Sequence, residues 1–130
     1  SQGLKCTLLL QQLLYKDYKT NSDLPIDKQR IYNAIDCILN WHNADGDGGW
    51  STYERNRGYD YYEIMNPSQV FMNIMIDYSH IECTSSCIQA LCLFKKYYGN
   101  YRDAEINAAI RAGLGFLKKK QDTDGKFIGF

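Results

Sequence analysis

Apolar residues recur at three- and four-residue spacing along most of this chain, and that periodicity restricts its possible folds. Between Ile26 and Asn43 the apolar positions are Ile31, Ala34, Ile35, Ile38 and Leu39. This spacing collects apolar side chains on one face of an α-helix, whereas a half-buried strand alternates at every second residue. No stretch alternates for long enough to form a sheet. The sequence therefore predicts an all-α fold.

Two more helices are expected in the first half of the chain and just beyond its middle. Leu4 to Leu14 is an apolar, helix-favouring run. Asn66-Pro67 combines a capping residue with one suited to the first helical position. The apolar face of the helix expected there consists of Val70, Phe71, Ile74 and Met75.

The two C-terminal helices are predicted from their flanking residues. Thr84-Ser85-Ser86 is expected to open one helix, and Gly99-Asn100 to end it. Asp103 is expected to cap the next, whose apolar stripe is Ile106, Ile110, Leu114 and Leu117. The other faces of this helix hold small residues that would let a second helix approach closely: Ala108, Ala109, Ala112, Gly113 and Gly115.

A weak internal repeat connects two of these helices. The stretch Arg111 to Phe127 echoes Tyr32 to Trp50, since each has a small residue, an apolar pair, an amide side chain, an acidic glycine turn and an aromatic residue. Repeated helix–turn units bury their apolar faces against their neighbours. The repeat favours a helical toroid or solenoid.

The segment Asn43 to Glu54, NADGDGGWSTYE, fits two templates. Its oxygen-bearing side chains and Gly48 are spaced as in the calcium loop of an EF-hand. That template needs an exit helix, which Gly58 would interrupt, and Lys120 occupies a ligand position in the second acidic turn. A calcium-binding or helical interaction module therefore remains the alternative to a repeat turn.

Composition excludes several classes of function. The chain has 130 residues, enough for one domain, and its 15 acidic and 15 basic residues give no reason to expect nucleic acid as a partner. It has no signal peptide or transmembrane run and begins without Met, so we expect a piece of a longer protein.

The five cysteines are scattered and odd in number, which favours buried, reduced thiols in an intracellular protein. No histidine is spaced to complete a zinc site with Cys83 and Cys87.

One motif near the C-terminus combines a basic residue, a small residue, an aromatic–aliphatic pair, Gln and Gly-x-aromatic: Arg111, Ala112, Phe116, Leu117, Gln121, Gly125 and Phe127. It resembles the QW repeat of the sterol-type oxidosqualene cyclases, the lanosterol and cycloartenol synthase-like enzymes, with Phe in place of the usual Trp. SQGLKCTLLLQQ resembles the sequence after the Asp-Cys-Thr of the DCTAE motif. DGGWSTYE and NPSQVFMNIMIDYSHIECTSS resemble two further family segments, so the similarity covers essentially the whole chain. A protein prenyltransferase toroid is the competing helical architecture, but Asp36-Cys37 lacks the spacing of its zinc ligands.

The resemblance implies a segment, residues 1–130, of the second α/α barrel of such a cyclase, with QW-type turns near residues 43–50 and 121–127. The family protonates (3S)-2,3-oxidosqualene and guides a carbocation to a tetracyclic sterol precursor, without a metal or organic cofactor. Its acid, the Asp of DCTAE, would lie three residues before Ser1, so this segment alone should be inactive. The implied partners are the lipid substrate and the rest of the cyclase chain, with membrane contact through other parts. The implied location is the endoplasmic reticulum membrane or a lipid droplet.

Three residues occupy positions with roles in that family. Cys83 matches the cysteine that hydrogen-bonds the catalytic Asp, and at a helix start the dipole would polarise its thiol. Tyr53 matches an active-site tyrosine whose ring face can stabilise a cation. Gln2 stands where the family has the Glu of DCTAE, which helps return the proton to the Asp, so the chain departs from the family pattern at that step. A small helix-capping hydrophobe and a packed loop tyrosine are the structural alternatives for Cys83 and Tyr53.

Overall fold

The computed structural model describes residues 1–17, 27–53, 55, 58–68, 75–121 and 125–126. The helices are α1 (Gln2–Asp17), α2 (Lys28–Asn40), α3 (Ile81–Tyr97) and α4 (Asp103–Lys120), with a 3-10 helix η1 (Asp60–Met65) between α2 and α3. The described residues contain no strand, although His42 and Trp50 form an isolated antiparallel bridge. The all-α prediction is therefore confirmed.

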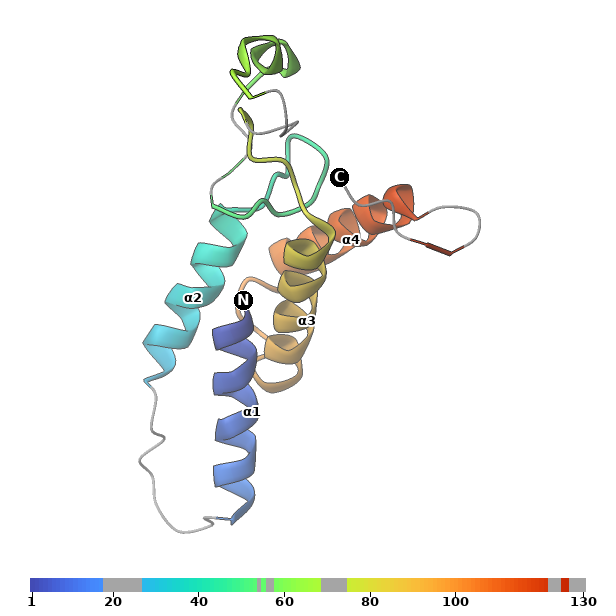
Figure 1. The fold of residues 1–130 in the computed structure, drawn as a ribbon. Coiled ribbons are helices and arrows are strands. Elements are labelled where there is room, and N and C mark those ends of the chain that lie inside the picture. The colour runs from blue at the N-terminus through green and yellow to red at the C-terminus, as the bar shows by residue number, and fades with distance from the viewer. Residues whose placement is uncertain (18–26, 54, 56–57, 69–74, 122–124, 127–130) are drawn as a thin grey trace.

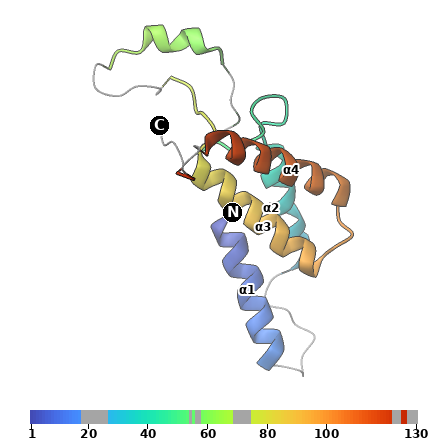
Figure 2. The same cartoon turned by 90° about the vertical axis from the view of Figure 1, so that its right-hand side faces the viewer.

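The four α-helices run alternately in opposite directions, and α3 lies beside α1 and also packs against α4 (Figure 1). α1 lies parallel to α3, because Ser1 Oγ is 2.7 Å from Ser86 Oγ and Lys5 Nζ donates to Gln89 Oε1 at 2.6 Å. α3 and α4 form an antiparallel hairpin across the turn 98–102, which Figure 2 shows from the side. α2 contacts the start of α4 through Asp36, which accepts hydrogen bonds from the Arg102 guanidinium at 2.6 Å and from the Tyr101 hydroxyl.

The core collects the apolar faces of all four α-helices. α1 contributes Leu4 and Leu8, and α2 contributes Ile31, Ile35 and Ile38, as the periodicity predicted. α3 and α4 contribute Ala90, Leu91, Phe94 and Ile106, which are as fully buried as Ile35 of α2. An aromatic cluster extends this core toward the α3–α4 turn, where the rings of Tyr32 and Tyr101 stack with centroids 4.3 Å apart.

The buried face of α4 differs from the predicted stripe. Leu114 is 51% exposed, and the buried line runs instead through Ile106, Ala109, Gly113 and Phe116. The cause is the close approach of other groups at Gly113, where an added Cβ would lie 2.9 Å from atoms of both Ile88 and Trp50. The predicted role of the small residues is therefore confirmed at Gly113. The prediction that Leu114 belongs to the buried stripe was wrong.

Two predicted helix starts are also corrected. α3 begins at Ile81, so the buried Thr84 lies inside the helix and its hydroxyl accepts from the Trp50 backbone N–H. The residue before α4 is Arg102, in the left-handed region with φ 47°, and Asp103 is the first helical residue. Asp103 does not cap, because its carboxylate instead accepts from Asn107 and pairs with Lys95. α2 is capped by Asp27, whose carboxylate accepts from the Gln29 N–H.

The helix predicted after Pro67 falls mainly outside the described residues. Its face residues Val70, Phe71 and Ile74 are not described, and neither Pro67, Ser68 nor Met75 is helical. Asn66 does accept a hydrogen bond from the Ser68 N–H at 2.9 Å, as a capping side chain would. The 3-10 helix η1, which the sequence did not predict, precedes it on an arm that projects from the four α-helices (Figures 1 and 2).

The prediction of buried cysteines was wrong for most of them. Cys87 is buried and Cys83 is half-buried, whereas Cys6, Cys37 and Cys92 are exposed. Each exposed thiol lies on a helix face that no other described element covers. Among the described helices, none combines the length and apolar character that crossing a bilayer requires.

Candidate active site around the first turn of α3

The turn Asn43–Trp50 closes on itself and brings Trp50 back against the helices. The Asn43 N–H donates to the Gly49 carbonyl at 3.1 Å, and the Gly48 N–H donates to the Asn43 carbonyl at 3.0 Å. Gly48 has φ 80° and lies so close to Ala112 of α4 that an added Cβ would contact it at 3.0 Å. The turn therefore requires glycine here for both its backbone conformation and its packing.

Trp50 joins three helices at one point. Its indole N–H donates to the Ile38 carbonyl at the end of α2 at 2.8 Å, and its backbone N–H donates to Thr84 Oγ1 at 3.0 Å. Its carbonyl accepts from the backbone N–H of His80, the residue before α3, at 3.0 Å. The ring also packs against Gly113 of α4 and is 2% exposed. These contacts fix the chain leading into α3 relative to α2 and α4.

The polar side chains of the turn bond to nearby serine hydroxyls and to a backbone N–H group, with a geometry unlike a calcium loop. Asn43 donates through its amide nitrogen to Ser51 Oγ at 3.0 Å and to Ser79 Oγ at 2.8 Å. Asp47 accepts from Ser79 Oγ at 2.7 Å and from the Gly49 N–H at 3.0 Å. Asp45 points away, with its side chain 96% exposed and paired with Arg55. The last loop position, Glu54, lies outside the described residues.

His42 lies under this turn in a largely apolar environment. The residue is 7% exposed, its ring centroid is 4.4 Å from that of Trp50, and its Nε2 lies 3.1 Å from the Gly48 carbonyl oxygen. Because a carbonyl can only accept, Nε2 carries a proton and donates. Burial lowers the pKa of His42, against the smaller opposing effect of the Gly48 carbonyl. The fold therefore favours the neutral ring.

Cys83 lies in the first turn of α3, beside the segment that follows Trp50. Its Sγ is 4.0 Å from Thr52 Oγ1, at the outer limit of a hydrogen bond to sulfur. Tyr53, the residue after Thr52, has an exposed side chain, and 78% of the residue is accessible. Asp77 holds both residues of this segment, since its two carboxylate oxygens accept from the backbone N–H groups of Thr52 at 3.2 Å and Tyr53 at 2.6 Å. The structure thus brings Cys83 and the Tyr53 segment together.

The start of α1 lies against the same part of α3. Ser1 Oγ is 2.7 Å from Ser86 Oγ, one helical turn after Cys83, and Ser1 also hydrogen-bonds the Cys87 thiol. Burial raises the pKa of that thiol, with the bond from Ser1 acting in the opposite direction. Gln2 is exposed beside Ser1. The predicted residues Gln2, Cys83 and Tyr53 therefore belong to three segments that meet at the beginning of α3.

Sequence reasoning missed two polar residues of this region. Asp77 and Thr52 were part of matched segments, but neither was assigned a role. The usable signal for Asp77 was an acidic side chain just before a helix that carries a candidate site residue in its first turn. Its partners are backbone N–H groups from a segment more than twenty residues earlier, and spacing alone does not reveal such pairs.

Comparison with known proteins decides the family. The chain is 42% identical to the cycloartenol synthase of Dictyostelium discoideum over 130 residues and 41% identical to the lanosterol synthase of Mus musculus over 129 residues. The lanosterol synthase of Homo sapiens is 40% identical over 129 residues. In each case the match covers 99% of this chain and 17% of the relative. The chain belongs to the oxidosqualene cyclase family.

The similarity to these cyclases confirms the resemblance found in the motifs. No protein-family profile matches the chain. The chain spans 17% of the length of these relatives. In the part of the segment that the structure describes, no three His, Cys, Asp or Glu side chains are grouped so as to hold a metal ion.

Proposed function

We propose that this chain is a segment of the second α/α barrel of an oxidosqualene cyclase and that the first turn of α3 supports its catalytic acid. The observation that carries the proposal is the contact of Ser1 with α3, because Ser1 Oγ lies 2.7 Å from Ser86 Oγ. Cys83 precedes Ser86 by three residues and is therefore on the same helix face, roughly 5 to 6 Å away.

An aspartate placed before Ser1 would be within reach of Cys83. In the family motif the acid stands three residues before Ser1, and three extended residues span at most about 10 Å. Ser1 is already beside Ser86, so a short return toward the N-terminus of α3 suffices. There the Cys83 thiol can donate to one oxygen of the carboxyl group.

Each of these residues has a separate role in the proposed chemistry. The upstream aspartic acid gives its proton to the epoxide oxygen of 2,3-oxidosqualene, and the ring opens as the first C–C bond forms. A thiol donor on the other carboxyl oxygen stabilises the carboxylate that develops, which makes the proton easier to transfer. The exposed ring of Tyr53 can face the cation, an interaction worth up to about 2 kcal/mol once water is excluded. Gln2 cannot ionise, so it can orient a water or carboxyl but cannot relay a proton.

The packing supports the barrel part of the proposal. Parallel α1 and α3 form one layer, and α2 with α4 forms a second, which is the alternation expected of an α/α toroid. Apolar side chains on the outside of both layers, Leu9, Leu10 and Leu114, are about half exposed and would be covered by neighbouring helices of the enzyme. We propose a location at the endoplasmic reticulum membrane or a lipid droplet, where so apolar a substrate accumulates, with membrane contact made by other parts of the enzyme.

The test compares the chain alone with a complete enzyme. Residues 1–130 replace the matching segment of the Dictyostelium discoideum cycloartenol synthase, and both proteins are incubated with 2,3-oxidosqualene. The chimera should form a tetracyclic product, whereas the chain alone should leave the substrate unchanged because the acid is missing. A folded but inactive chimera would count against the proposal, and cyclisation by the chain alone would place the acid elsewhere.

A further inference from the structure

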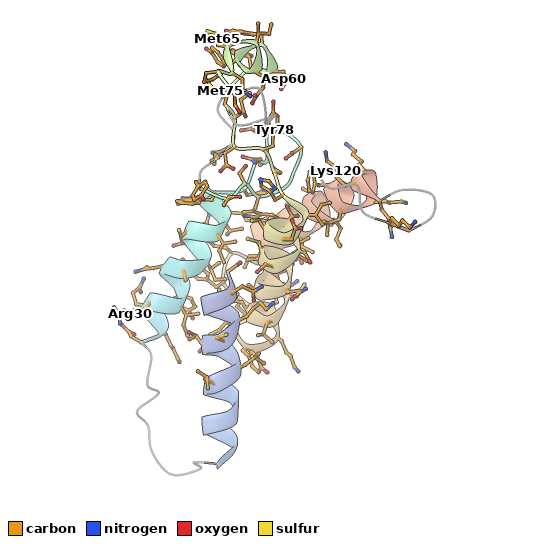
Figure 3. All side chains as sticks on the ribbon, viewed as in Figure 1. Arg30, Asp60, Met65, Met75, Tyr78 and Lys120 are labelled. Carbon is orange, nitrogen blue, oxygen red and sulfur yellow. The ribbon has the colours of Figure 1, made fainter. Side chains whose placement is uncertain are left out.

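We infer that Asp77 is a positioning residue, which holds the backbone of Tyr53 beside Cys83 so that the tyrosine ring faces the reacting cation. The inference rests on the proposed function, because it assigns a role in the same site. Asp77 lies in the segment between η1 and α3, where the projecting arm returns to the helices (Figure 3 labels the next residue, Tyr78). Asp77 lies within one of the segments that resemble the family, but no role was assigned to it above.

The contact is a two-point clamp on consecutive backbone groups. Asp77 Oδ1 accepts from the Thr52 N–H at 3.2 Å, and Oδ2 accepts from the Tyr53 N–H at 2.6 Å. Two bonds from one planar carboxylate fix both the position and the orientation of the peptide that joins Thr52 to Tyr53. Hydrogen bonds to an ionised acceptor are stronger than those between neutral groups.

The segment that carries Asp77 is held in place by hydrogen bonds of the residues that follow it. Two residues on, Ser79 is fully buried, with its hydroxyl bonded to Asp47 and Asn43. The following His80 donates its backbone N–H to the Trp50 carbonyl at 3.0 Å. The segment carrying Asp77 is therefore anchored to the Trp50 turn on one side and to α3 on the other.

The two hydrogen bonds from Asp77 set the position of the Tyr53 backbone relative to Cys83. The Tyr53 side chain is exposed, with 78% of the residue accessible, so packing of its ring within the segment does not set its position. Thr52 lies 4.0 Å from Cys83 Sγ, and the clamp fixes the next residue at a defined distance from the same sulfur. A cation–π contact depends on the placement of the ring face, and small displacements of positioning groups can slow catalysis about a hundredfold.

The experiment uses the chimeric cyclase that carries residues 1–130, with the variants Asp77→Asn and Asp77→Glu. Asn keeps one acceptor oxygen but turns an NH2 group toward the second N–H, whereas Glu keeps both oxygens on a longer stem. We expect kcat to fall on the order of ten- to a hundredfold in Asp77→Asn with KM nearly unchanged. Asp77→Glu should recover part of the rate. In a Tyr53→Ala background Asp77→Asn should add little, because the ring it positions is gone.

A matched control is available in the same arm. Glu63 Oε1 also accepts from two consecutive backbone N–H groups, those of Met75 at 3.0 Å and Ile76 at 3.1 Å. Glu63→Ala therefore removes the acceptor of a similar contact that does not touch the Tyr53 segment, and kcat should stay within about twofold of the parent. Equal losses of kcat in Glu63→Ala and Asp77→Asn would reduce Asp77 to a general structural role and overturn the inference.

Hydrogen–deuterium exchange separates this inference from the proposed function. Peptides that cover Thr52 and Tyr53 should exchange faster in Asp77→Asn than in the parent chimera, whether or not the chimera is active. Unchanged exchange would overturn the clamp, and faster exchange with normal kcat would overturn its catalytic role. A folded parent chimera without activity would overturn the proposed function and the role of Asp77 in it, while exchange still reports on the clamp.

Discussion

The ring of Trp50 lies directly against Gly113 of α4, so closely that a Cβ at Gly113 would come within 2.9 Å of the ring carbon Cζ3. Trp50 is also bonded to the Ile38 carbonyl and to Thr84, and it therefore connects α2, α3 and α4. The contact is the point at which the acidic glycine turn is fixed to the helical layers. The position of the candidate site depends on it, because the segment from Trp50 to Tyr53 continues directly from this anchor.

The first prediction concerns this contact. Gly113→Ala should lower the free energy of unfolding of the chain by about 1 to 3 kcal/mol, because a methyl group is forced between Ile88 and Trp50. Gly115→Ala is the matched control, since nothing lies within 4 Å of a Cβ there and helix propensity alone should stabilise by roughly 0.5 to 1 kcal/mol. Urea denaturation followed by circular dichroism measures both. Equal stabilisation by the two alanines would contradict the packing described at Gly113.

The second prediction is a pH dependence of stability that comes from His42. Its pKa in the fold is lowered by burial, so on acidification the unfolded chain takes up this proton first. Stability is then fully present above the ordinary histidine value of about 6.5 and is lost as the pH falls below it. Urea midpoints at about pH 8 and about pH 5.5 should therefore differ, with the lower midpoint in acid.

His42→Gln tests the assignment, because glutamine can donate to the Gly48 carbonyl but does not titrate in this range. The variant should lose part of the difference between the two midpoints. A difference of the same size in His42→Gln and in the parent would assign the pH dependence to other groups.

Much of the fold was predictable from sequence, since the buried residues of α2, Ile31, Ile35 and Ile38, follow directly from their apolar spacing. The misassigned face of α4 has a definite physical cause. Leu114 continues a regular stripe, but the close approach of Trp50 selects the small residue Gly113 for the buried position. Periodicity ranks residues by hydrophobicity and cannot show that Trp50, from a distant part of the sequence, packs there. The same limit applies to Cys92. Cysteine is typical of protein cores, but Cys92 is exposed on a helix face that no other described element covers.

The candidate site, like the fold, was only partly predictable from the sequence. Cys83 and Tyr53 were assigned because their motifs are local. Cys83 lies in the first turn of α3, and Tyr53 directly follows Thr52, whose hydroxyl lies 4.0 Å from the Cys83 sulfur. The polar groups that hold them were not found. Asp77 reaches Tyr53, and Asn43 reaches Ser79, across 24 and 36 positions of sequence. Such contacts depend on how the turn folds back on α3, which the residue order does not encode in any short pattern.

The third prediction addresses the calcium alternative. In the folded turn Asn43 directs its amide nitrogen to Ser51 and Ser79, and Asp47 Oδ1 already accepts from Ser79 and the Gly49 N–H, at 2.7 to 3.0 Å. Tight calcium binding would require this arrangement to change, because the ion binds oxygen atoms. Calorimetric titration with Ca²⁺ should therefore show no micromolar binding, and Trp50 fluorescence should not change. Micromolar affinity together with a fluorescence change that Asp47→Ala abolishes would restore the EF-hand hypothesis.

The fourth prediction concerns Cys83 in the chimeric cyclase. Cys83→Ala removes one donor to the carboxylate that develops on the upstream acid, and kcat should fall on the order of ten- to a thousandfold. Stability should change little, because one atom is lost from a half-buried position at a helix start. Cys83→Ser keeps a donor of similar size and should retain more of the activity than alanine does.

Cys87→Ala is the control for this experiment, one turn further along the same helix. Cys87 is 8% exposed and belongs to the core, so its truncation should lower stability by about 1 kcal/mol while leaving turnover per folded molecule nearly intact. Its hydrogen bond from Ser1 adds a second reason for a loss of stability, since the start of α1 is attached there. Thermal unfolding and product formation are measured on the same preparations. If Cys83→Ala cyclises normally and Cys87→Ala does not, the thiol that supports the acid is Cys87, and the first turn of α3 has only a structural role.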